Sequence, residues 1–232
     1  PRASVWSRDA TRLIFSEGAG ILEWAREGGV RTLYTSGSPL RDLSIVWQGS
    51  SGGARGVAAV PRGDADIWAL PLDPETLVPT GPALQLARST LTENHPRLSP
   101  DGTRFAFVST RGGSSEVWVA DASGENPRQV SNLGSFISGY PRWSPDGRRI
   151  AFHARVPNDA NLYVVDADAG VPRKVAPGTA PVWSPDGRYL YAVLGAFGLF
   201  RVAVDNGIVE PLFEGQFPVV TLDGSRIIYA GR

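Results

Sequence analysis

The sequence predicts an all-β fold, and three observations lead to that prediction. A short motif recurs, as WSPDG at residues 143–147 and 183–187 and as LSPDG at 98–102. Each copy is followed by a run of β-branched and aromatic residues, which favours a strand. The three copies start 45 and 40 residues apart. Short strands repeated at roughly this period are typical of the four-stranded antiparallel blades of a β-propeller.

Weaker copies extend the repeat along the chain. They are VTLDG at 220–224 and WSRDA at 6–10, and Trp47 stands where the remaining copy should be. The anchors 6, 47, 98, 143, 183 and 220 are 41, 51, 45, 40 and 37 residues apart. We therefore expect a single propeller domain over residues 1–232. Its blades cover approximately residues 3–38, 43–88, 94–133, 139–178 and 179–215, with a partial sixth at 216–232.

Within a blade, the inner strand ends at the anchor and a hairpin follows. Ser-Pro-Asp-Gly suits a tight turn, because Pro presets φ at the second position and Gly accepts the left-handed conformation. The second strand comes next, as in RRIAFHA, TRFAFVST and RYLYAVL, then a third, as in NLYVVDAD and EVWVADA. A shorter fourth strand, such as PRQVSN, closes the unit. No segment shows helical periodicity with caps.

The sixth blade is expected to be incomplete. Blades one to five contain four strands each, whereas the sixth stops at Arg232 after two, and nothing before the innermost strand at Ser4 could supply the missing ones. Two interpretations remain open. Either the chain is a fragment whose further residues complete the blade, or the exposed edge of SRIIYAG pairs with strands of a partner.

Composition excludes several classes of function. The 232 residues include 23 basic and 23 acidic side chains, so the balance argues against a nucleic-acid partner or an anionic membrane surface. No stretch reaches the roughly 18–20 apolar residues that span a bilayer. Cysteine is absent, which excludes disulfides, thiolate metal sites and thiol nucleophiles.

Motifs for bond chemistry are also missing. The two histidines, His95 and His153, have no metal-ligand spacing, and QGSSGG at 48–53 lacks the Gly-x-Ser-x-Gly pattern of a serine hydrolase. SSGGARG has no Gly-Lys-Ser/Thr ending for a phosphate loop. The acidic pairs in DADAG and GDAD offer too few ligands for calcium, and the Asp of each turn is expected to satisfy its own backbone. We expect no catalytic residue, no metal and no cofactor, and hence no enzyme.

The tryptophans fit a structural role. Four share the anchor position and three recur at the third strand, so packing between blades explains them better than a ligand cage. The four are Trp6, Trp47, Trp143 and Trp183, and the three are Trp24, Trp68 and Trp118.

YPRWSPDGRRIAF at 140–152, followed by NLYVVDADAG at 161–170, resembles the TolB-like propeller repeat, a relative of the WD40 family. The motif is specific in blades three to five, fair in one and six, and poor in two. The resemblance implies a propeller, six-bladed in TolB itself, and with the missing cysteines it favours a periplasmic or other extracytoplasmic location. It implies no single activity, because the repeat occurs in colicin-translocation proteins, in peptidase gating domains and in bacterial signalling proteins.

Binding is then expected at the mouth of the propeller, formed by residues just before each inner strand. Mixed aromatic, polar and basic groups on rigid loops suit recognition of a peptide or a protein loop. The candidates are Ser44, Asn94, His95, Tyr140, Thr179 and Phe217, with Arg97 and Arg142 nearby. The favoured function is a non-catalytic protein-binding scaffold, either the sensor or interaction domain of a bacterial signalling protein or a TolB-like protein. The alternative is the gating propeller of a prolyl-oligopeptidase-like or tricorn-like peptidase.

Overall fold

A computed structural model describes most of the chain. The described residues are 4–6, 12–17, 19–25, 28–35, 39–48, 53–62, 64–87, 91–156, 159–168, 170–195, 198–221 and 224–230. The predicted turns at 7–10 and 49–52 lie outside them, as do Leu222, Asp223 and Arg232. The side chains of Trp6, Trp47 and Phe217 also lie outside the described part, although their backbones belong to strands.

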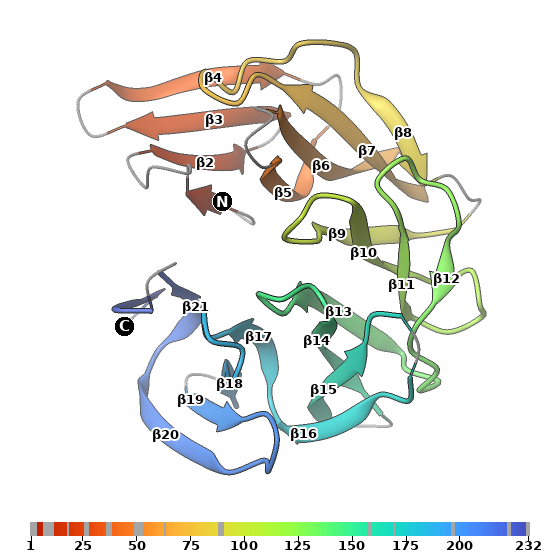
Figure 1. The fold of residues 1–232 in the computed structure, drawn as a ribbon, viewed down its shortest axis with the longest axis vertical. Coiled ribbons are helices and arrows are strands. Elements are labelled where there is room, and N and C mark those ends of the chain that lie inside the picture. The colour runs from red at the N-terminus through yellow and green to blue at the C-terminus, as the bar shows by residue number, and fades with distance from the viewer. Residues whose placement is uncertain are drawn as a thin grey trace. The chain divides into compact units, whose positions relative to one another are not determined.

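The first three sheets have four strands each (Figure 1). The first is β1 (Ser4–Trp6), β2 (Arg12–Glu17), β3 (Gly20–Ala25) and β4 (Gly29–Thr35), in that order. The second is β5 (Arg41–Gln48), β6 (Gly53–Arg62), β7 (Asp64–Leu72) and β8 (Leu84–Ala87). The third is β9 (Glu93–Leu98), β10 (Arg104–Ser109), β11 (Glu116–Asp121) and the short β12 (Arg128–Gln129).

The remaining sheets repeat the pattern. The fourth is β13 (Ile137–Trp143), β14 (Arg149–Arg155), β15 (Ala160–Asp166) and β16 (Arg173–Pro177). The fifth is β17 (Thr179–Trp183), β18 (Tyr189–Leu194), β19 (Gly198–Ala203) and β20 (Val209–Glu214), and a two-stranded sheet pairs β21 (Gln216–Val220) with β22 (Ile227–Ala230). No helix occurs among the described residues. The prediction of an all-β fold of four-stranded antiparallel sheets is confirmed.

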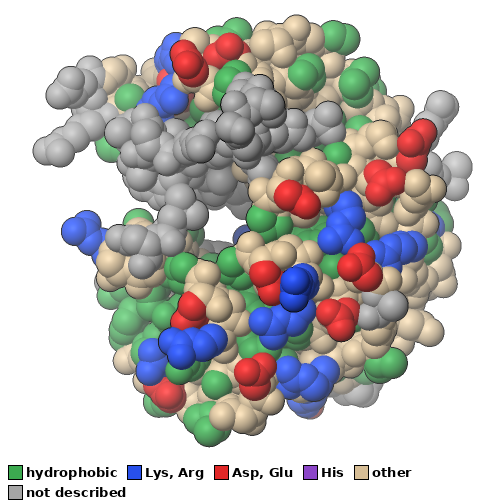
Figure 2. Space-filling view, in the orientation of Figure 1, with side chains coloured by type: hydrophobic (Ala, Val, Ile, Leu, Met, Phe, Trp, Pro, Cys, Tyr) green, Lys and Arg blue, Asp and Glu red, His purple; other side chains and the backbone are tan. Residues whose placement is uncertain are grey.

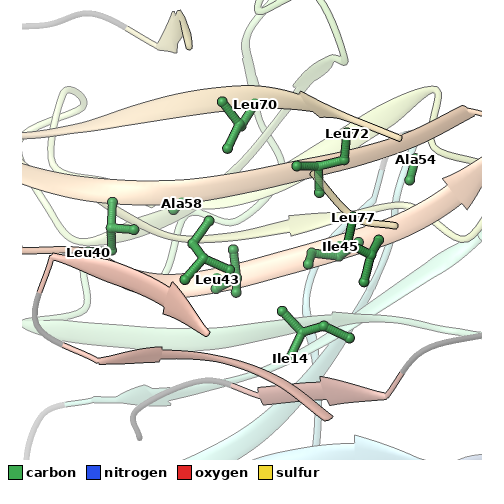
Figure 3. Packing of buried hydrophobic residues seen from close by; sticks show 10 residues of the cluster. Ile14, Leu40, Leu43, Ile45, Ala54, Ala58, Leu70, Leu72 and Leu77 are labelled. Atoms are coloured by element: carbon green, nitrogen blue, oxygen red, sulfur yellow. The ribbon is translucent and has the colours of Figure 1, made fainter. Parts of the chain in front are cut away.

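The chain forms two compact units, each with its own core. The N-terminal unit comprises residues 1–111 and 120–127, and the C-terminal unit comprises 112–119 and 128–232. In the N-terminal unit, apolar side chains from β2, β5, β6 and β7 converge (Figure 3). They are Ile14, Leu43, Ile45, Ala54, Ala58, Leu70 and Leu72, joined by Leu40 and Leu77 from the adjoining loops. In the C-terminal unit, Leu162, Leu190 and Phe200 belong to a similar cluster. Burial of these side chains is the main driving force for each core.

The Ser-Pro-Asp-Gly turns form the predicted tight hairpins. The glycine φ angles are +70° at Gly102, +68° at Gly147 and +68° at Gly187, so each glycine adopts the left-handed conformation. In each turn the Gly N–H donates to the carbonyl of the Ser, at 2.9 Å. The hairpin is therefore set by local sequence.

A side-chain network completes each turn. Ser184 Oγ donates to Asp186 Oδ1 at 2.6 Å and accepts from Tyr189 N at 2.9 Å. Asp186 Oδ1 also accepts from Arg188 N at 3.0 Å. The hydrogen bonds from Ser184 and from Arg188 lower the pKa of Asp186 to about 2. The corresponding contacts recur around Ser99 and Ser144, which confirms that the turn aspartates satisfy their own backbone.

The tryptophans only partly follow the prediction of inter-blade packing. Trp183 is 7% exposed, its Nε1 donates to Arg142 O of β13 at 2.8 Å, and the Arg149 guanidinium lies 5.0 Å from its ring centre. The prediction is confirmed there. At Trp24, which is 39% exposed, it is wrong, because the sheet face that carries Trp24 and its cross-strand neighbour Val30 is open to solvent.

Candidate functional site

The inner strands carry a bulge at the same place in the repeat. In β13, Gly139 pairs with His153 and Arg142 pairs with Ala151, so two residues face one on β14. The registers of β9 and β17 shift in the same way. The first bulged residue is left-handed each time, with φ of +52° at His95, Tyr140 and Ala180. A proline follows in all three copies, where a missing N–H is tolerated because the ladder is interrupted.

The left-handed conformation is costly for these residue types. For a residue other than glycine it costs roughly 1–2 kcal/mol, since Cβ approaches the following carbonyl oxygen. A bulge re-aims a side chain away from the regular alternation, and strained residues of this kind cluster at functional sites. We call the part of each inner strand from its first residue through the bulge the bulge end, and the Ser-Pro-Asp-Gly side the turn end.

The predicted binding residues lie inside the inner strands, so the expectation that they precede the strands is wrong. The strands continue through the bulge, because pairing resumes beyond it, as between Asn94 and Val108. Their positions are as follows: Ser44 in β5, Asn94, His95 and Arg97 in β9, Tyr140 and Arg142 in β13, Thr179 at the start of β17, and Phe217 in β21.

In the N-terminal unit the predicted residues form hydrogen bonds with other parts of the fold or with their neighbours in sequence. Ser44 is buried, and its Oγ accepts from Leu98 N at 3.3 Å, so it ties β5 to β9. Asn94 Oδ1 accepts from His95 Nδ1 at 2.8 Å, and Arg97 Nη1 donates to Pro96 O at 2.7 Å. Asn94, His95 and Arg97 remain half-buried and accessible.

In the C-terminal unit Tyr140 stacks on His153. The ring centres are 5.5 Å apart and the rings are 24° from parallel. His153 is only 8% exposed, so it is a packed histidine beneath an accessible tyrosine. Thr179 Oγ1 donates to Val193 O at 3.5 Å. Tyr140 thus has a supported ring at the bulge end.

A cavity of about 220 Å³ lies at the turn end of the C-terminal unit. It is lined by Arg142, Trp143, Pro145, Val182, Trp183, Ser184, Pro185, Val220 and Thr221. Arg142 is the one member of the predicted set among them. This cavity could not be predicted from the sequence, because its tryptophans and prolines belong to the repeat and a hollow between three inner strands depends on how those strands pack.

Two buried carboxylates, those of Glu23 and Glu93, also could not be recognised from the sequence. Glu23 pairs with Arg12 and Arg31, and Glu93 pairs with Arg111. Arg12 also donates to Glu75 O at 2.7 Å, which links the first and second sheets. No group of three potential metal-ligating side chains occurs among the residues that the structure describes. In the same part of the chain no helix is long and apolar enough to cross a membrane.

Comparison with known structures supports the fold. TolB from Acinetobacter baumannii superposes with a TM-score of 0.69 at 18% identity, over 92% of this chain and 55% of that one. An oligogalacturonate lyase in complex with manganese superposes with a TM-score of 0.70 at 15% identity, over 97% of this chain and 72% of that one. Puromycin hydrolase superposes with a TM-score of 0.70 at 16% identity, over 100% of this chain and 47% of that one. Identities this low show the fold alone, a β-propeller.

Two comparisons of sequence add information beyond the fold. A segment of 70 residues is 40% identical to Tricorn protease homolog 1 of Streptomyces coelicolor, covering 30% of this chain and 6% of that protein. The chain thus matches a small part of that relative and spans about half the length of TolB. The family model of the TolB β-propeller domain matches residues 82–232, more than half of the chain. The chain belongs to the TolB β-propeller domain family.

Proposed function

We propose that this propeller is a non-catalytic module that binds an extended peptide or a protein loop at the bulge ends of β13 and β17, in its C-terminal unit. The observation that carries the proposal is the left-handed φ of +52° shared by His95, Tyr140 and Ala180. The backbone keeps this costly conformation while the side chain changes from imidazole to phenol to methyl. A rigid backbone that presents varied side chains is typical of a recognition surface.

The chemistry of the described residues supports a binding role. The hydroxyls and carboxylates of the Ser-Pro-Asp-Gly turns are engaged with one another, so they do not form a nucleophile and base. Acidic and basic side chains are interspersed on the described part of the face drawn in Figure 2. A surface of mixed sign disfavours nucleic acid and suits a protein partner. Within this proposal the module serves a bacterial signalling protein or a TolB-like protein.

A second candidate is the gating propeller of a peptidase. It is favoured by the identity of 40% over 70 residues with Tricorn protease homolog 1 and by the likeness to puromycin hydrolase. In that role the same peptide-binding surface would select or admit substrates for a catalytic domain elsewhere in the protein. Hydrolysis of short peptides by the protein expressed from its native gene would favour this candidate, and binding without hydrolysis would favour the first.

The direct test is selection of a displayed library of random linear peptides on the immobilised 232-residue protein. We expect enrichment of a peptide family, with affinities that fall by about tenfold or more in Tyr140→Ala. Arg201→Ala is the matched control, because Arg201 lies on β19 and pairs with Glu210 on the outer strand β20. Failure to enrich any peptide, or equal losses in the two variants, would contradict the proposal.

A further inference from the structure

The connection between β12 and β13 is held by a buried carboxylate. Glu116 begins β11 and is fully buried. Its Oε1 accepts from Leu133 N and Gly134 N at 2.8 Å each, and from Ser114 Oγ at 3.1 Å. Ser131 Oγ donates to the other oxygen, Oε2. The carboxylate therefore gathers backbone and side-chain donors from the connection itself and from the residue Ser114, which precedes β11.

Burial of a carboxylate is tolerated only where hydrogen bonds replace its hydration. Glu116 forms no ion pair among those of the described residues. The hydrogen bonds from these donors therefore replace its lost hydration, and hydrogen bonds to a charged acceptor are strong. Ser115 N donates to Ser135 O at 3.0 Å, and Ser135 Oγ donates to Arg155 O at 3.2 Å. The loop is thus fixed to both β11 and β14.

Phe136 stands at the end of this fixed loop, directly before β13. It is 78% exposed, the largest value among the aromatic side chains of the described residues. Arg155 ends β14 opposite Ile137, the first residue of β13, so it lies at the same end of the fourth sheet. Arg155 is exposed and forms no ion pair with any described residue, and Asp159 is the nearest acidic residue along its loop.

We propose that Phe136 is the apolar anchor of the peptide-binding surface and that Glu116 is the positioning residue that holds its loop. The ligand is an extended peptide that places an apolar side chain against Phe136 and a carboxylate beside Arg155. This inference rests on the proposed function and names the chemistry of its ligand. It adds a residue outside the bulge, four positions before Tyr140, to the binding surface.

The physical reason is preorganisation. Single exposed apolar residues are common and need no explanation. A buried carboxylate devoted to the backbone of the loop is unusual, and it reduces the entropy that the loop would lose on binding. Exposed aromatic rings on rigid supports dominate binding energy once a partner covers them. A cation at the rim, here Arg155, selects partners by charge.

The anchor is tested with the library-selected peptides by fluorescence anisotropy. We expect Phe136→Ser to weaken binding by about thirtyfold, the fold-change of a binding hot spot. Val171→Ser is the matched control, because Val171 is 89% exposed in the loop between β15 and β16, and it should leave the affinity unchanged. Equal losses in the two variants would overturn the anchor, since they would indicate general apolar adhesion.

The ligand chemistry is tested by charge reversal. Selected peptides should carry an acidic residue beside an apolar one, and Arg155→Glu should weaken them. A peptide with Lys in place of that acid should bind Arg155→Glu better than it binds the unmodified protein. Weakening without recovery by the Lys peptide would overturn the assignment of a carboxylate ligand.

The role of Glu116 has its own measurement. Glu116→Gln should raise hydrogen exchange at the Leu133 and Gly134 amides and weaken the peptide, at a temperature where the variant remains folded. Faster exchange with unchanged affinity would overturn the positioning role. Selection of no peptide would instead refute the proposed function. Selected peptides that respond to Tyr140→Ala but not to Phe136→Ser would refute the anchor and leave the function intact.

Discussion

At the turn end of the inner strands, three Ser-Pro-Asp-Gly segments repeat the same hydrogen bonds, with the Gly N–H to Ser O distance at 2.9 Å in every copy. At the bulge end the backbone repeats as well, with φ of +52° three times, but the side chains are His95, Tyr140 and Ala180. The turn end thus repeats both its residues and its hydrogen bonds, whereas the bulge end repeats only its backbone conformation. The difference shows that the turn end builds the blade, and it agrees with the proposal that the bulge end binds a partner.

The largest effect should come from the buried tryptophan of the turn end. Trp183→Ala removes a ring that is 7% exposed and the bond from Nε1 to Arg142 O, and large-to-small changes of this kind cost about 3–5 kcal/mol. Trp24→Ala, at a position 39% exposed, should cost less than about 1 kcal/mol. Urea unfolding checks both. Similar losses would remove the distinction between architectural and exposed tryptophans.

The next largest loss of stability should come from the side-chain hydrogen bonds of a Ser-Pro-Asp-Gly turn. Ser99→Ala leaves Arg104 N without its side-chain acceptor and removes one of the two hydroxyl donors to Asp101, the other being Thr103 Oγ1, so the free energy of unfolding should fall by about 1–3 kcal/mol. Ser123→Ala is the control, because Ser123 is exposed and its contact with Glu125 is long, at 3.3 Å. An unaffected Ser99 variant would mean that Pro and Gly alone set the hairpin.

At the bulge end, the right substitution should raise the free energy of unfolding instead of lowering it. Ala180→Gly relieves the left-handed cost of roughly 1–2 kcal/mol, less the added entropy of glycine in the unfolded chain, for a net gain of about 0.5–1 kcal/mol. Ala192→Gly, in the buried interior of β18, should lose about 1 kcal/mol. Chemical unfolding of the two variants gives the comparison, and destabilisation by both would show that the bulge is unstrained.

The smallest effect concerns pH. Asp186 has its pKa lowered from 3.8 to about 2, first by the Ser184 hydroxyl. A carboxylate with a lowered pKa stabilises the folded state above pH ~4, and this stabilisation is lost as the pH falls toward about 2. Asp186→Asn should therefore show a shallower loss of stability across that window. The change should be small, since the group is exposed and solvent screens it. Identical acid profiles would show that the turn carboxylate contributes nothing.

Local sequence explains what could be predicted. Pro and Gly fix the turns, and alternating apolar residues fix the strands, so both follow from a few adjacent residues. The bulge could not be located, because a register shift such as that between Gly139 and Arg142 depends on the partner strand. Exposure of Trp24 depends on what covers one face of the first sheet.

The candidate site was predicted less well for the same reason. Tyr140 was chosen for its register near the start of an inner strand, and its place in a binding site stays a prediction. Ser44, chosen in the same way, is buried and bonds to Leu98, 54 residues away in sequence. The Glu116 network joins a carboxylate to amides 17 and 18 residues away, and no spacing rule indicates such a contact. Phe136 has no repeat position, so only its exposure on the folded chain draws notice.

The bulge end is proposed to bind the peptide, whereas the turn end stabilises the blade. One experiment separates the two roles: affinity for one selected peptide and unfolding free energy are both measured in Tyr140→Ala and Ser99→Ala. We expect Tyr140→Ala to lose affinity by about tenfold with a modest change in stability, and Ser99→Ala to lose stability by about 1–3 kcal/mol with unchanged affinity. Loss of affinity in Ser99→Ala that equals the loss in Tyr140→Ala would contradict the account.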